Sequence, residues 1–316
     1  MFNEDYISLE ILKSSEKTAI ASFPFIGKND KIGADGAATD MLRESLNSID
    51  MKGRVVIGEG EMDEAPMLYI GEKLGTGNGA EIDIAVDPID GTTPCAKGLD
   101  NSCVVIAVAE KGNLLNAPDI YMEKIAVGGG LPSGIIDIKK TPEQNIRAVA
   151  EAKGKDFSEI TVCTLKRDRH QYIIDDAKKL GCKLKLLNDG DVAGIISTTM
   201  QDDEKSDIFI GKGGAPEGII AAAALSCVGG QMQGILCPKN DEEIARMNKW
   251  GITDEAIVYN LEDMAKGNVI FCGTSITNGM FGKGVRQEDG KFIVESFILR
   301  SSIAKPEMFS NIYDKK

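Results

Sequence analysis

Apolar residues recur at roughly helical spacing in residues 6–22, which predicts an amphipathic helix. A second helix is expected at residues 35–49. A further helix is expected at residues 67–74, because Pro66 suits the first turn of a helix. Continuous apolar runs that are too short for helices predict buried strands. These runs lie at residues 54–57, 82–86 and 103–109.

After residue 150 the pattern changes to an alternation of short apolar runs and helical segments. Repeated strand–helix units predict an α/β layer that is rich in parallel strands. The expected strands are 160–165, 183–187, 207–210 and 234–237, and the expected helices are 170–180, 192–199, 216–228 and 241–249. Two later apolar segments, 268–272 and 291–299, are expected to close this sheet. The polar tail, residues 301–316, is expected to fray.

The predicted fold class is therefore α/β, with an α+β N-terminal half. We place the N-terminal domain at residues 1–150 and the C-terminal α/β domain at residues 151–316. A chain of 316 residues is long enough for two such domains. Residues 116–124 are predicted to form a loop that leads into a short element.

The charge of the chain narrows the classes of partner. Its 36 Lys and Arg against 49 Asp and Glu give a net charge of −13, which argues against nucleic acid and anionic membranes. The longest nearly apolar stretch, residues 219–228, is too short to span a membrane. No secretory signal is apparent, and the seven cysteines are scattered without a C-x-x-C pair. We expect reduced thiols and a cytoplasmic protein.

The motif Asp87-Pro88-Ile89-Asp90-Gly91-Thr92-Thr93 follows the apolar run at 82–86. Pro88 and Gly91 predict a tight turn at the end of a strand. Two carboxylates three residues apart on such a turn can converge on one point, and divalent cations such as Mg²⁺ prefer carboxylate oxygens. The alternative is a solvated turn, since Asp, Pro and Gly are ordinary turn residues.

Two other acidic positions in the first half fit the same chemistry. The glycine-rich loop 58–66 follows a strand and carries four acids within six residues, which suits cation binding. It can equally be a solvated acidic turn. Asp35 is either a metal ligand or the cap of the helix that begins there.

Three loops in the second half follow predicted strands, where open α/β sheets bind ligands. Residues 166–170 supply three cations suited to a phosphate, or form a solvated basic turn. Asp189 and Asp191 suit sugar hydroxyls, or cap the next helix. Residues 211–217 are rich in glycine and lead into a helix, where Glu217 is either a metal ligand or an ordinary acid in the first helical turn.

These motifs resemble the class II fructose-1,6-bisphosphatases, a bacterial type that includes the fructose/sedoheptulose bisphosphatases of cyanobacteria. The resemblance covers nearly the whole chain, and contiguous strings at matching spacing make it specific. The strings begin at Asp30, Val56, Asp87, Asn116, Asp189 and Gly213. The resemblance implies the layered α-β-α-β-α sugar phosphatase fold of the lithium-sensitive phosphatases, assembled as a homodimer or homotetramer.

The resemblance also implies a role for individual residues. It implies Mg²⁺ or Mn²⁺ held by Asp35, Glu59, Asp87, Asp90 and Glu217. It implies that Lys31, Asp63 and Thr92 surround the attacking water. It implies that the substrate is bound by Asp90, Gly91, Thr92, Tyr121, Arg167, Asp168, Arg169, Asp189, Gly190, Asp191 and Gly214.

The implied reaction is hydrolysis of the 1-phosphate of fructose 1,6-bisphosphate to fructose 6-phosphate, a gluconeogenic step, with sedoheptulose 1,7-bisphosphate as a further substrate. Metals that hold the attacking and leaving oxygens, with an acid–hydroxyl pair to take a proton, fit such chemistry. Two alternatives stay open. One is a related phosphatase of an inositol phosphate or a 3′-phosphonucleotide, and the other is a sugar-phosphate sensor without catalysis.

Overall fold

The computed structural model describes residues 2–58, 68–200 and 205–315. The chain divides into two compact units. The first comprises Met1–Leu115 and Gly267–Lys316, and the second comprises Asn116–Lys266. The boundary predicted at residue 150 instead falls inside a helix of the second unit, and the C-terminal segment returns to the first unit.

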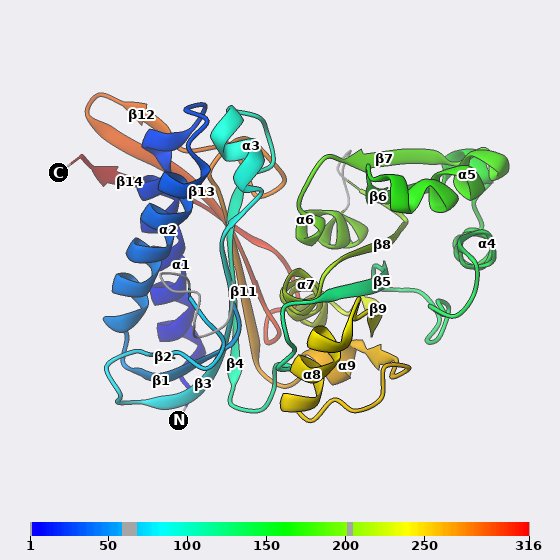
Figure 1. Ribbon diagram of the computed structural model, residues 1–316. Helices are drawn as coiled ribbons and strands as arrows, with labels where there is room; N and C mark the ends of the chain where they lie inside the picture. The colour runs from blue at the N-terminus through cyan, green and yellow to red at the C-terminus, as the bar shows by residue number, and fades with distance from the viewer. Residues whose placement is uncertain (1, 59–67, 201–204, 316) are drawn as a thin grey trace. The chain divides into compact units, whose positions relative to one another are not determined.

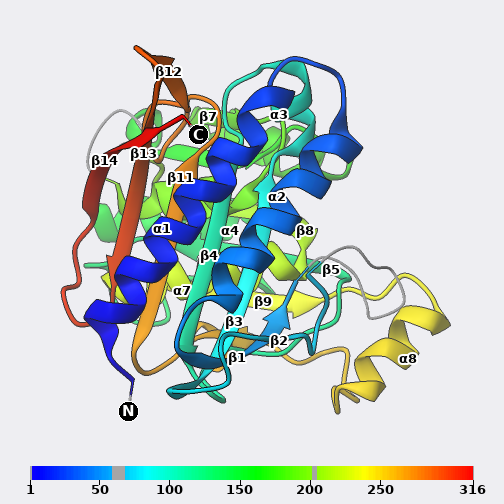
Figure 2. The same cartoon turned by 90° about the vertical axis from the view of Figure 1, so that its left-hand side faces the viewer.

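The first unit is a sheet with two long helices on one face, α1 (Glu4–Ser22) and α2 (Lys31–Asn47) (Figure 2). The strand order is β12-β13-β11-β4-β3-β1-β2, and β14 pairs with β13. The strands are β1 (Met51–Ile57), β2 (Lys73–Leu74), β3 (Ala80–Asp90), β4 (Cys103–Glu110), β11 (Val269–Ser275), β12 (Arg286–Glu288), β13 (Lys291–Arg300) and β14 (Glu307–Asp314). Two short helices, η1 (Phe23–Phe25) and α3 (Thr92–Lys97), lie in the same unit. Apolar side chains of α1, α2 and the facing side of the sheet form its core.

The second unit is also a sheet, with strand order β10-β9-β5-β8-β6-β7 (Figure 1). Its strands are β5 (Tyr121–Val127), β6 (Thr161–Leu165), β7 (Lys183–Leu187), β8 (Ile208–Gly214), β9 (Gln231–Leu236) and β10 (Tyr259–Asn260). Its helices are α4 (Pro142–Lys153), η3 (Phe157–Glu159), η4 (Asp168–His170), α5 (Gln171–Leu180), α6 (Asp191–Ile196), η5 (Ser197–Thr199), α7 (Ala215–Val228), α8 (Asp241–Lys249) and α9 (Leu261–Met264).

Side chains alternate across β5, and this sorts the helices of the second unit onto two faces. Ile125 and Val127 belong to the core that includes Ile146 of α4 and Ile173 of α5. The intervening Lys124 packs against Gly218 of α7, where an added Cβ would lie 3.0 Å from the lysine Cδ. Lys124 therefore points to the α7 side of the sheet, opposite to α4 and α5.

The mixed α/β class is confirmed, but several local predictions are wrong. In the second sheet, β6 pairs parallel with β7 and β8 as the strand–helix units predicted, but β5 pairs antiparallel with both β8 and β9, so the sheet is mixed. The segments predicted at 268–272 and 291–299 belong to the first sheet, where β11 pairs with β4. The tail is not frayed, since Glu307–Asp314 forms β14.

The helix predicted at residues 67–74 is absent from the described part of that range. Lys73 and Leu74 instead form β2, which pairs with β1. Gly71 has φ +97°, in the left-handed region, which is incompatible with a helix passing through it. Among the described residues, no helix has the length and apolar character needed to cross a bilayer.

Candidate functional site

Asp87 and Asp90 lie at the end of β3, which is longer than the sequence predicted. The strand continues through the motif to Asp90, and the turn starts only at Gly91. Asp87 is paired with Val105 of β4 and Asp90 with Cys103, so three steps on β3 match two on β4. This is a β-bulge, a common way to re-aim side chains near active sites.

The bulge brings the two carboxylates to the same face of the sheet. Val105 and Cys103 are two residues apart on β4 and share a face, and so must their partners Asp87 and Asp90. Burial and then the charges of Asp90 and Asp87 raise the pKa of the Cys103 thiol well above its ordinary value. Because their charges act on this thiol, both carboxylates lie near it, and Asp87 and Asp90 are themselves buried, at 8% and 5% exposed.

The turn after Asp90 depends on glycine. Gly91 has φ +88°, and an added Cβ would lie 2.8 Å from the carbonyl oxygen of Asn101. Helix α3 starts directly after it, so that Thr92 occupies its first turn. The sequence predicted a turn here, and the structure places that turn between a bulged strand and a short helix.

Helix α2 supplies two further predicted site residues, Lys31 and Asp35. The hydroxyl of Thr92 lies 3.1 Å from a carboxylate oxygen of Asp35, to which it donates. Burial raises the pKa of Asp35, while the Thr92 hydroxyl and the charge of Lys31 oppose the rise. The ammonium of Lys31 donates to the hydroxyl of Thr93 at 2.7 Å. Thus Lys31, Asp35 and Thr92 share the end of the sheet that carries Asp90.

The carboxylates of Asp35, Asp87 and Asp90 fit a hard divalent cation, because such cations prefer carboxylate oxygens. Within the described ranges, no three His, Cys, Asp or Glu side chains are grouped closely enough to form a complete metal site. The predicted ligand Glu59 and the predicted catalytic Asp63 lie outside the described residues. Asp35, Asp87 and Asp90 therefore stay predicted ligands.

In the second unit, two loops predicted to bind the sugar contact a buried lysine, Lys124, which the sequence analysis did not identify. Lys124 is 1% exposed and forms an ion pair with Asp191, the first residue of α6. Its ammonium also donates to the carbonyl oxygen of Gly214 at 2.8 Å. An available signal was the position of Lys124 in an otherwise apolar alternation, Met122-x-Lys124-x-Ala126.

The paired glycines before α7 allow acidic side chains to approach the backbone. A Cβ on Gly213 would lie 2.3 Å from an Asp191 carboxylate oxygen, and one on Gly214 would lie 2.0 Å from Glu217 Oε2. That Oε2 is buried and has no hydrogen-bond partner among the described residues. Burial and the Asp191 charge raise the pKa of Glu217 to about 7, against the opposing charge of Lys124. Such a carboxylate suits a cation, so Glu217 stays a predicted ligand.

The basic loop after β6 is fixed by hydrogen bonds to neighbouring loops. Arg167 forms an ion pair with Asp189 at 2.9 Å and donates to the carbonyl oxygen of Asn188 at 2.5 Å. Asp168 starts η4, while Gly190 has φ +68° and precedes α6. The predicted substrate residues 167–168 and 189–191 therefore lie side by side in the second unit.

The ring of Tyr121 contacts two cations. The guanidinium carbon of Arg169 is 5.0 Å from the centroid of its ring, and the ammonium of Lys239 is 3.7 Å from it. Arg169 also donates to the carbonyl oxygen of Lys212 at 3.0 Å. Lys239 was not predicted, because nothing in its local sequence indicates that it lies beside Tyr121.

His170, the last residue of the basic loop, uses both of its ring nitrogens in bonds to the backbone and has none available for a phosphate. It is fully buried, with Nδ1 2.9 Å from the carbonyl oxygen of Leu165. Its Nε2 accepts from the N–H of Lys212 at 2.8 Å. Burial is the main cause that lowers the pKa of His170, so the neutral ring is favoured. Both ring nitrogens are thus used within the fold.

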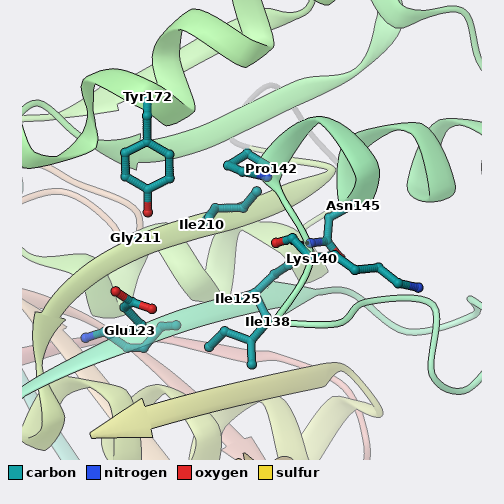
Figure 3. Close-up of a pocket in the computed structure, with 10 residues that line it drawn as sticks. Glu123, Ile125, Ile138, Lys140, Pro142, Asn145, Tyr172, Ile210 and Gly211 are labelled. Carbon is teal, nitrogen blue, oxygen red and sulfur yellow. Dashed lines mark hydrogen bonds between the residues drawn. The ribbon is translucent and has the colours of Figure 1, made fainter. Parts of the chain in front are cut away.

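Figure 3 shows a hollow on the other face of this sheet, toward α4 and α5. Its volume is about 50 Å³, and its lining includes Glu123, Asn145 and Tyr172. Lys124 contributes to the wall, but its ammonium is directed to Asp191 on the α7 side. None of the predicted catalytic, substrate or metal residues lines this hollow.

Comparison with known proteins places the chain in a family. The family described as "Bacterial fructose-1,6-bisphosphatase, glpX-encoded" matches residues 5–311. The chain is 43% identical over 308 residues to fructose-1,6-bisphosphatase 1 class 2 of Escherichia coli K12, covering 93% of this chain and 91% of that protein. The class 2 protein of Shigella flexneri matches with the same identity and coverage.

Solved structures give weaker similarities. An extragenic suppressor from Pyrococcus furiosus has a TM-score of 0.32 and 13% identity, covering 62% of this chain and 70% of that chain. An inositol monophosphatase from Anabaena has a TM-score of 0.31 and 12% identity, covering 62% of this chain and 71% of that chain. The resemblance drawn from the sequence motifs is confirmed by the family match and by the E. coli relative. On these two findings, the chain belongs to the bacterial, glpX-encoded fructose-1,6-bisphosphatase family.

Proposed function

We propose that this protein hydrolyses the 1-phosphate of fructose 1,6-bisphosphate, giving fructose 6-phosphate and inorganic phosphate. Membership of the fructose-1,6-bisphosphatase family supports the substrate and the reaction. The observation that carries the chemistry is the pair Asp87 and Asp90, two buried carboxylates aimed to one face by the bulge in β3. The reaction belongs to gluconeogenesis.

Asp35, Glu59, Asp87, Asp90 and Glu217 are the residues that would hold Mg²⁺ or Mn²⁺. When bound, such ions supply charge neutralisation for the reacting phosphate and activate water. Phosphate-monoester hydrolysis is among the slowest uncatalysed reactions, so the chain must also position the reacting groups well. The choice between the two metals is open to measurement.

Thr92 and Lys31 are assigned to the reacting phosphate and the water. The Thr92 hydroxyl donates to Asp35, and this hydrogen bond fixes the position of the hydroxyl. The lone pairs of the hydroxyl oxygen point away from Asp35. In our proposal, Asp63 acts with Thr92 to take the proton from the attacking water. Residues 90–92 hold the scissile phosphate with the N–H groups of the first turn of α3.

The residues of the second unit are assigned to the rest of the substrate. Arg169 and Lys239 flank Tyr121 and supply positive charge for the phosphate that does not react. Asp189, Gly190, Asp191 and Gly214 are assigned to the sugar. Activity on sedoheptulose 1,7-bisphosphate, assembly into a homodimer or homotetramer, and a cytoplasmic location belong to the same proposal.

A substrate panel tests this assignment. Phosphate release is measured with fructose 1,6-bisphosphate, an inositol monophosphate and a 3′-phosphonucleotide, each with Mg²⁺ and with Mn²⁺. Preferential turnover of fructose 1,6-bisphosphate, with fructose 6-phosphate as product, is expected. Preference for another substrate would make the protein a related phosphatase. Metal and bisphosphate binding without any turnover would make it a sensor.

A further inference from the structure

Strand β14 forms a long free edge of the first sheet. It pairs with β13, and no described strand pairs with its other side. The ladder runs without a register shift from Lys291↔Asp314 to Ile298↔Glu307. Such edges attract other strands, and proteins usually protect them with bulges, prolines or lysines. Residues 307–314 contain neither proline nor lysine, so such protections are confined to the flanking residues Lys305, Pro306 and Lys315.

The outward side of β14 presents the backbone groups of its even-numbered residues. The N–H of Lys315 donates to the carbonyl oxygen of Gly290, the residue before β13, at 3.1 Å. Backbone groups of alternate residues in a strand point the same way, so those of the odd-numbered residues face β13. The residues whose N–H and C=O groups point outward are Met308, Ser310, Ile312 and Asp314.

The same alternation sorts the side chains of β14 onto two faces. Asn311 and Tyr313 hydrogen-bond to Glu16 of α1, at 3.0 and 2.5 Å. On the opposite face Met308 is 57% exposed and Ile312 is 65% exposed. The free edge therefore carries two exposed apolar side chains, placed symmetrically about Ser310.

We propose that β14 is an interface between two copies of this chain, with the two strands antiparallel across a two-fold axis at Ser310. In such a pair, the outward N–H and C=O groups can form hydrogen bonds across the interface only if an even-numbered residue of one copy faces an even-numbered residue of the other. Centring on Ser310 meets this condition. It also places Met308 of each copy opposite Ile312 of the other, so that both exposed apolar side chains gain an apolar cross-strand partner.

Other registers fit less well. Centring on Asn311 would place Asp314 opposite Met308, a charge against an apolar side chain. An axis at Phe309 would place Met308 opposite Ser310, so that Met308 and Ile312 would no longer face each other. Within residues 307–314 the Ser310 register sets Glu307 opposite Tyr313, and like charges meet only outside the strand, where Lys305 faces Lys315. An interface of this kind is isologous, the usual form in dimers, and it does not depend on the proposed enzyme activity.

The first test is the oligomeric state of the full chain by light scattering and sedimentation. We expect a dimer whose dissociation constant rises by at least about tenfold in Ile312→Lys, since one lysine then faces Met308 in each of two symmetric contacts. Leu99→Lys is the matched control, because Leu99 is a 51% exposed apolar residue of the same unit that lies outside β14. It should leave the dimer unchanged.

The second test fixes the register by oxidation of introduced cysteines. Ser310 faces itself across the axis, in a hydrogen-bonded pair with Cα atoms about 5.5 Å apart, which is within disulfide range. Ser310→Cys should therefore form an intermolecular disulfide, while the wild type with its seven cysteines should not. Met308→Cys alone and Ile312→Cys alone should fail to cross-link, and an oxidised mixture of the two should succeed.

These outcomes decide the proposal. A dimer that Ile312→Lys weakens and Ser310→Cys cross-links supports it. A monomer at micromolar concentration overturns it, as does an oligomer that Ile312→Lys leaves intact and Ser310→Cys does not cross-link. Cross-linking by Met308→Cys alone would contradict the Ser310 register. The circular dichroism spectrum of each variant shows that the chain is folded.

Discussion

The ammonium of Lys124 and the carboxylate of Asp191 form an ion pair inside the second unit, with their side chains 0% and 3% exposed. Lys124 lies in β5 and Asp191 begins α6, so the pair joins a strand to the loop assigned to the sugar. The same ammonium donates to the carbonyl oxygen of Gly214. One buried charge thus holds two of the segments proposed to contact the substrate.

Replacing Lys124 by methionine keeps most of the length of the side chain, one atom short, and removes its charge. Because this leaves Asp191 buried without its partner, we expect a loss of about 3–5 kcal/mol in the free energy of unfolding. Denaturant unfolding measures it. Lys111→Met is the matched control, since Lys111 pairs with Glu81 on the surface with both side chains 60% exposed, and it should cost under about 1 kcal/mol. Equal effects at both sites would refute this role of Lys124.

Thr92→Val removes the hydroxyl that contacts Asp35 and keeps the shape of the side chain. We expect kcat to fall by roughly 10²–10⁴, the usual range for a positioned proton-transfer group, with little change in KM. Steady-state kinetics measure both constants. A variant with lower stability and unchanged kcat would show that Thr92 is only structural.

Arg169→Ala is expected to raise KM for the bisphosphate without a matching loss of kcat, and so is Arg167→Ala. Each loses a charge-assisted contact worth about 1.5–3 kcal/mol, or roughly 10–100-fold in kcat/KM. Arg147→Ala is a control in the same unit, because Arg147 is exposed and pairs with Glu143. If either loop variant loses kcat alone, its arginine acts on the reacting phosphate.

His170→Gln should keep kcat within about tenfold, a barrier change of no more than ~1.4 kcal/mol. The reason is that His170 is buried and both ring nitrogens bond to the backbone. Loss of those bonds should lower stability by about 1–3 kcal/mol. A pH–rate profile and an unfolding curve measure the two effects. Loss of several orders of magnitude in kcat with a stable fold would make His170 the general base.

Glu16 is expected to make stability depend on pH. It is fully buried and accepts hydrogen bonds from Ser296, Asn311 and Tyr313, yet burial raises its pKa above 4.5. A raised carboxyl pKa means that the folded state holds its proton more tightly than the unfolded state. This contribution is fully present below the unfolded pKa and is lost as pH rises through the folded pKa. The stability of the wild type relative to Glu16→Gln should therefore increase as pH falls from neutral. A difference that does not vary with pH would contradict the raised pKa.

Local motifs allowed much of the site to be predicted. The apolar run before Asp87 indicated a strand that delivers a carboxylate, and the structure extends that strand to Asp90. Thr141 and Pro142 are residue types that favour the start of a helix in any sequence, and Thr141 caps α4. Such features depend on neighbouring residues, so the sequence contains their cause.

Pairing between distant segments could not be predicted in the same way. The predicted loop at residues 116–124 includes the first half of β5, where Glu123 and Lys124 interrupt the apolar pattern, although Lys124 is satisfied by Asp191 much later in the chain. β14 reads as a polar tail because Ser310 and Asn311 lie at its centre. The return of β11 to β4 likewise depends on tertiary contacts that no local pattern records.

The most direct test of the central claim is turnover of fructose 1,6-bisphosphate by wild type and Asp87→Asn as Mg²⁺ or Mn²⁺ is added. Glu81→Gln, an exposed change on the same strand, is the control. We predict metal-dependent release of phosphate by the wild type and the control. We also predict release at background level by Asp87→Asn, with its fold intact, because a hard anionic ligand is lost. Turnover and metal affinity in Asp87→Asn equal to those of the wild type would contradict the account.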